Sequence, residues 1–144
     1  MIPLLVGLAA WESAWWLRRR AKRTSVFAVA RAEATRLGRP LVVIGAPDGG
    51  ITAGYPCGDV TVDLRSSTCP GAIRADVTQR LPFADDSYVV FCSCVLEYVQ
   101  DADAAVHEIA RIFGGHAFFV GVEPWCMAAY VYPGARRVLH ARYR

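Results

Sequence analysis

A glycine cluster follows the first apolar run of the chain. The segment "VVIGAPDGG", residues 42–50, passes from β-branched residues into glycines at positions 45, 49 and 50. A strand that ends in glycines lets the main chain approach a ligand closely and present amide groups to it. Pro47, at the centre of the segment, has no amide hydrogen to donate. The segment therefore indicates either a working cofactor loop or the remnant of one.

Polar side chains lie at or near the ends of the later apolar runs. Asp63 follows "TV", Asp76 follows "IRA", and Cys92, Ser93 and Cys94 lie in the longest β-branched and aromatic run, "YVVFCSCVL". In an open parallel sheet, ligands bind beyond the carboxyl ends of the strands, so these residues are candidates for one shared site. A structural interpretation stays open for each, because the two aspartates can cap turns and the cysteines can fill a core.

No catalytic or metal-binding constellation accompanies these candidates. The cysteines stand at positions 57, 69, 92, 94 and 126, without the spacing of a metal site, and they favour a reducing cytoplasm. His107, His116 and His140 are expected on the surface or at helix ends, and no nucleophile–base pair can be inferred from spacing. We therefore predict no catalytic side chain and no metal.

Alternating strands and helices must position the candidate residues. Strands are predicted over 41–44, 59–64, 73–77, the first part of 88–96 and 116–122, with helices over 24–38 and from Asp101 to Gly114. Thr24 or Ser25 can cap the first of these helices and Gly38 can end it. Residues 124–144 are predicted to form short helices, or a helix and a strand, at the end of the domain. The fold class is α/β with a mostly parallel central sheet.

Residues 40–123 resemble the class I S-adenosylmethionine-dependent methyltransferases, a Rossmann-like family. The resemblance is most specific over 76–115, where six elements occur in order: Asp76, Leu81-Pro82-Phe83, Asp86-Ser87, Val95-Leu96-Glu97, Glu108 with Arg111, and Gly114-Gly115. It implies that Gly45 and Gly49 face the methionine part of S-adenosylmethionine, Asp63 the ribose hydroxyls and Asp76 the adenine, and that Cys92 borders the methyl donor. We expect Glu97 and Glu108 to be structural.

The chain departs from the family pattern at the cofactor loop and at its end. Val43 stands where the family has an acid, and Pro47 replaces the middle glycine. Residues 50–62 are too few and too rich in glycine and proline for the usual helix. Only 21 residues remain from Pro124 onward. The sequence thus predicts a truncated, degenerate methyltransferase fold, with S-adenosylmethionine as cofactor only where the family function is retained.

The first 17 residues are apolar apart from Glu12 and precede the basic segment 18–23. Seventeen helical residues span roughly 25 Å, against about 30 Å for a bilayer core. A cleaved signal peptide would carry its cations first, and a buried or interfacial helix is the second possibility. We predict a single transmembrane helix over 1–17, a membrane-flanking segment over 18–23, and a domain over 24–144 on the cytoplasmic side. Glu12 then needs a partner.

Charge is concentrated at the two ends of the chain. The net charge is +3, but residues 24–135 hold seven basic and twelve acidic residues, a poor surface for nucleic acid. The last 20 residues alternate aromatic side chains with arginines, as protein interfaces do.

Three functions fit these observations. The first is a non-catalytic accessory or structural subunit of a larger membrane protein assembly, with membrane lipid and other subunits as partners. The alternative is an active methyltransferase that acts on a small or membrane-associated substrate. The third is a protein-binding module that holds a nucleoside as a structural ligand.

Overall fold

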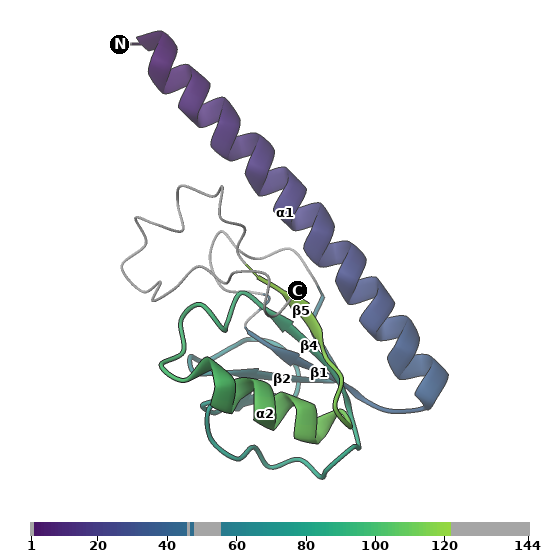
Figure 1. Cartoon of the computed structure of the whole chain (residues 1–144). Helices are drawn as coiled ribbons and strands as arrows, with labels where there is room; N and C mark the ends of the chain where they lie inside the picture. Colours follow the sequence, from purple (N-terminus) through teal and green to yellow (C-terminus); the bar gives the residue numbers. More distant parts are fainter. Residues whose placement is uncertain (1, 46, 48–55, 122–144) are drawn as a thin grey trace.

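Five parallel strands form one sheet in the order β3-β2-β1-β4-β5 (Figure 1). This computed structural model describes residues 2–45, 47 and 56–121. The strands are Leu41–Ile44 (β1), Val60–Asp63 (β2), Ala72–Arg74 (β3), Val89–Ser93 (β4) and Phe118–Val120 (β5). All four pairings are parallel. The predicted α/β class and parallel sheet are confirmed, and the edge position of β3 follows the prediction.

The central strands are buried because helices cover the sheet. Every residue of β1 and β4 is buried. Helix α1, Ile2–Leu37, packs on β4 and β5, with the ring of Phe27 5.5 Å from that of Phe91. Helix α2, Ala102–Ile112, packs on β4, and Figure 1 shows the two helices on opposite faces of the sheet. Two-sided coverage explains why these strands are continuous apolar runs without alternation.

Helix α1 is one uninterrupted element, although a helix start was predicted near residue 24. Thr24 is a helix-interior residue, whose Oγ1 donates to the carbonyl of Arg20 at 3.0 Å. The predicted end is correct, since Gly38 has φ +63° and the N–H of Arg39 donates to Ala34 at 3.0 Å. The buried residues of α1 begin at Arg23, so the preceding part of the helix projects past the sheet (Figure 1).

The prediction of a transmembrane helix over 1–17 is wrong. No helix in the described part of the chain is long and apolar enough to cross a membrane. The apolar stretch ends at Leu17, and the same helix continues directly into arginines. Glu12, for which a partner was expected in a neighbouring protein, lies 3.9 Å from Arg19 on its own helix.

Helix α2 follows its sequence signals closely. The Asp101 carboxylate accepts a hydrogen bond from the N–H of Ala104 at 2.9 Å and caps the helix. Its apolar face is buried at Ala102, Ala105, Ile109 and Ile112. Gly114 and Gly115 follow it, with φ of +55° and +88°.

Two cysteines differ from the prediction of reduced thiols, because Cys57 and Cys69 form a disulfide. The pair joins the segment before β2 to the segment before β3. Cys92 and Cys94 are free thiols. Cys126, the closing elements and Gly49 lie outside the described residues. The predicted loss of a helix after β1 is partly tested, since residues 56–59 are non-helical and 48–55 are not described.

Candidate functional site

The carboxyl edge of the sheet brings the candidate residues together. The strand order reverses between β1 and β4, which is where open α/β sheets bind ligands. Ile44 pairs with Val62 on one side and Cys92 on the other. Gly45 follows Ile44 directly, next to the ends of β2 at Asp63 and β4 at Ser93.

Gly45 has a backbone that other residues rarely adopt. Its φ is +100°, it is buried, and its N–H donates to the carbonyl of Val62 at 2.9 Å. A side chain at this φ would be strained, so the glycine is required by the turn itself. This glycine follows β1 directly, at the switch point of the sheet.

Asp63 and Asp76 are held in fixed orientations by the main chain after each strand. Asp63 is the last residue of β2, and its Oδ1 accepts from the N–H of Arg65 at 2.7 Å. Oδ1 of Asp76 accepts from the N–H of Thr78 at 2.9 Å and from its hydroxyl at 2.8 Å. Both carboxylates thus stabilise turns, which was the structural interpretation of each, and both also lie on the carboxyl side of their strands.

Cys92 lies inside the core. It pairs with Ile44 and Phe119 in the sheet, and burial, followed by the nearby charge of Glu97, raises its pKa well above the usual value. Cys94, the residue after β4, is closer to the edge. Burial and then Glu97 raise the pKa of the Cys94 thiol to about 11, so the thiol is neutral at physiological pH.

Cys94 also has an unusual main chain for a residue other than glycine. Its φ is +53°, and its N–H donates to the carbonyl of Val120 at 2.7 Å. Left-handed residues of this kind cluster at functional sites, where the surrounding structure holds them in place.

Two buried charged residues at this edge were not predicted as a group. Arg23 is 3% exposed and Glu97 is 2% exposed, and both affect the pKa of Cys94. Sequence spacing contains a signal for Arg23, because it precedes Phe27 by four residues and Ala30 by seven, on the buried face of α1. Its place in a run of cations concealed that signal.

The signature residues of 81–83 contact α2. Arg111 donates from Nη1 to the carbonyl of Phe83 at 2.9 Å and from Nη2 to that of Leu81 at 3.3 Å. Arg111 also pairs with Asp85 and with Glu108. Glu108, which was expected to be structural, therefore pairs with Arg111, and Arg111 anchors the segment between β3 and β4.

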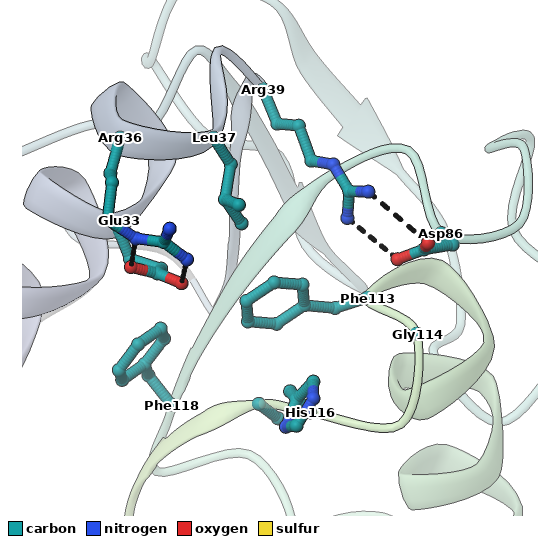
Figure 2. A pocket seen from close by; sticks show the side chains of 10 residues that line it. Glu33, Arg36, Leu37, Arg39, Asp86, Phe113, Gly114, His116 and Phe118 are labelled. Atoms are coloured by element: carbon teal, nitrogen blue, oxygen red, sulfur yellow. Dashed lines mark hydrogen bonds and ion pairs between the residues drawn. The ribbon is translucent and has the colours of Figure 1, made fainter.

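A cavity of about 460 Å³ lies at the opposite, amino edge of the sheet. Figure 2 shows Arg36 paired with Glu33 and Arg39 paired with Asp86 in its lining. The lining contains His116 but none of the residues predicted to bind a cofactor. Its guanidinium groups already face carboxylates, so the cavity offers little net charge to a ligand.

Comparison with protein families gives one match. Residues 59–120 match a family described as methyltransferase domain, from just before β2 to the end of β5. The match spans less than half of the chain and includes Asp63, Asp76 and Cys92, but not Gly45. Comparisons with curated proteins and with solved structures gave no match. The chain is therefore similar to methyltransferase domains over these residues, as the sequence motifs indicated.

Proposed function

We propose, from this similarity, that the chain binds S-adenosylmethionine at the carboxyl edge of its sheet and acts as a methyltransferase on a small or membrane-associated acceptor. The observation that carries the proposal is the position of Gly45. Its positive φ follows Ile44 directly, at the switch point where β2 ends at Asp63 and β4 at Ser93. In this assignment Asp63 accepts the ribose hydroxyls and Asp76 meets the adenine amino group.

The described residues fit the nucleoside half of the cofactor better than the methionine half. Asp63 and Asp76 supply oriented carboxylates beyond β2 and β3. Val43, at the position of the expected acid, is fully buried in β1 and offers no charge to the ammonium group. Gly49, the other predicted loop glycine, lies outside the described residues.

S-adenosylmethionine supplies an electrophilic methyl group that the acceptor's lone pair takes while the sulfur leaves with the C–S electrons. The chain's own residues then have to orient the acceptor and exclude competitors. Ser93 and Cys94 border the switch point after β4. Because the pKa of Cys94 is about 11, its thiol is neutral and does not compete as a nucleophile. Positioning of this kind needs no covalent side-chain chemistry.

A non-catalytic subunit of a larger membrane assembly is the second candidate. Val43 and Pro47 favour it, since the first removes an acid and the second an amide donor from the loop position. A domain of this kind could also hold a nucleoside as a structural ligand.

Isothermal titration calorimetry with S-adenosylmethionine separates these candidates. The proposal expects saturable binding by the full chain, and a loss of about tenfold or more in D63N, because a charge-assisted hydrogen bond is removed. E33Q makes the same charge change at the amino edge and should bind like the parent protein. No heat at about 1 mM ligand would favour the non-catalytic candidate.

A further inference from the structure

The amino-terminal part of α1 carries large apolar side chains that are exposed in the described part of the fold. Leu5, Val6, Trp11 and Leu17 are each more than half exposed, and Leu8 is 39% exposed. They belong to the part of the helix that projects beyond the sheet (Figure 1). We call residues 5–17 the apolar tip. A cluster of this kind on a folded chain marks an interaction surface.

The exposed apolar side chains spread over more than one face of the helix. With a turn of 100° per residue, Leu5, Val6 and Leu8 point in three different directions around the axis. Trp11 lies about 60° from Leu8 and Leu17 about 20° from Val6, so the five side chains cover about two thirds of the circumference. A protein partner, or a second copy of this chain, would cover one stripe of the tip and leave the remainder in water. A lipid environment contacts a helix from every side.

A ring of cations follows the tip directly. Arg18 lies over the ring of Trp15 at 5.3 Å, and Arg20 lies over that of Trp16 at 5.4 Å. Lys22 is exposed one turn further on. The order along the axis is thus apolar, aromatic and cationic, which matches the order of acyl chains, interface and phosphates in an anionic bilayer.

The length of the tip limits how deeply it can enter. The seven residues from Leu5 to Trp11 contain no charge and span about 10 Å, the depth at which interfacial helices bury their apolar side chains. Glu12 follows and pairs with Arg19 at 3.9 Å, so its charge is offset near the headgroups. Such a tip enters one leaflet without crossing.

The tip lies on the same side of the molecule as the candidate site. A turn at residues 38–40 leads from α1 into β1, so the helix runs back along the sheet and extends past its carboxyl edge (Figure 1). The charges of Arg23 and Arg19 act to lower the pKa of Cys94 at that edge, so this part of the helix lies near the candidate site.

We propose that the apolar tip of α1 inserts into the outer part of a bilayer containing anionic lipid, with the ring of cations at the phosphates and the carboxyl edge of the sheet facing the membrane. Membrane docking does not depend on the proposed methyltransferase function. Only the further step, in which the carboxyl edge meets an acceptor dissolved in the membrane, rests on that function.

Vesicle co-sedimentation of the full chain tests the docking. We expect binding to vesicles of phosphatidylcholine with phosphatidylglycerol, and weaker binding to phosphatidylcholine alone. L5S/L8S should bind about tenfold or more weakly, since two apolar side chains lose their burial in lipid. R18Q/R20Q should bind anionic vesicles roughly 25-fold more weakly and lose most of the preference for them. V29S is the matched control, because Val29 is 55% exposed on the part of α1 beside the sheet.

Two results would overturn the docking proposal. One is the absence of binding to either vesicle. The other is a dimer of the parent protein, seen by light scattering, that L5S/L8S converts to a monomer, because the tip would then be an interface between copies. Circular dichroism establishes that each variant is folded. Loss of calorimetric binding of S-adenosylmethionine would leave the vesicle result unchanged, so the two proposals can fail separately.

Discussion

The carboxylate of Glu108, on α2, accepts a hydrogen bond from the main-chain N–H of Leu81 at 2.7 Å. The two residues are 27 positions apart, and the contact ties the segment between β3 and β4 to the helix that follows β4. Because that segment contains Asp76, α2 helps to hold in place the residue that we propose meets the adenine. The signature residues of this region are thus connected structurally as well as in sequence order.

E108Q is predicted to lower the free energy of unfolding by about 1–3 kcal/mol at pH 7, because it removes one of the two carboxylates that pair with Arg111 in a partly buried network. Urea denaturation measures the change. E33Q is the matched control, since Glu33 pairs with Arg36 at the same spacing but on the surface. E33Q should leave the midpoint unchanged, and an equal loss in both variants would contradict a special role for Glu108.

The effect of Glu108 should disappear in acid. Its hydrogen bond with Arg111 is the main cause that lowers the pKa of Glu108 below the ordinary value of 4.5. A lowered pKa means that the stabilisation is complete above that ordinary value and is lost as the pH falls through the lower folded-state pKa. Urea midpoints of the parent protein and E108Q should therefore converge as the pH falls below 4.5. Parallel curves down to the acid transition would contradict this origin.

G114A is predicted to destabilise the chain more than G38A. Both glycines have φ near +60°, so alanine costs roughly 1 kcal/mol at each. A Cβ at Gly38 meets no atom within 4 Å, whereas one at Gly114 lies 2.3 Å from Oδ1 of Asp86, which Arg39 holds in place. Thermal denaturation compares the two variants, and equal Tm values would show that Asp86 moves aside without cost.

Reduction of the disulfide should destabilise the fold by roughly 3 kcal/mol, the value expected from the entropy of a loop of this length. C57S/C69S should unfold at the same urea concentration as the reduced parent protein. Dithiothreitol should have no effect on that variant. If dithiothreitol leaves the parent protein unchanged as well, Cys57 and Cys69 are not linked in solution.

Local sequence signals predicted the elements that have clear boundaries. The strand predicted over residues 41–44 was correct, because a short continuous apolar run between Pro40 and Gly45 suits a buried strand. The helix start predicted at Asp101 and the helix end predicted at Gly38 were correct, because a cap and a left-handed glycine act through the adjacent main chain. The continuous helix α1 was missed, since Thr24 resembles a cap although its hydroxyl bonds within the helix.

The candidate site was predictable in part for a similar reason. Strand ends place Asp63 and Asp76 at one edge once the strands are known to be parallel. Cys92 was placed too near the edge, because the strand continues to Ser93. The pairing of Cys57 with Cys69 could not be deduced, since spacing alone does not determine which cysteines meet.

G45A is predicted to weaken binding of S-adenosylmethionine and to destabilise the fold by more than about 1 kcal/mol, because alanine strains a backbone at φ +100°. G7A is the contrasting control. A Cβ at Gly7 meets no atom within 4 Å and the residue is helical, so alanine should stabilise α1 by up to about 1 kcal/mol. Unchanged ligand affinity in G45A would remove Gly45 from the site.

The central claim is that the carboxyl edge of the sheet binds the cofactor. Titration of the ¹⁵N-labelled protein with S-adenosylhomocysteine, followed by amide chemical shifts, tests it most directly. The account predicts shifts at Gly45, Asp63, Asp76 and Ser93, and none around His116 at the amino edge. A spectrum that stays unchanged at about 1 mM ligand, or shifts that gather at the amino edge, would contradict it.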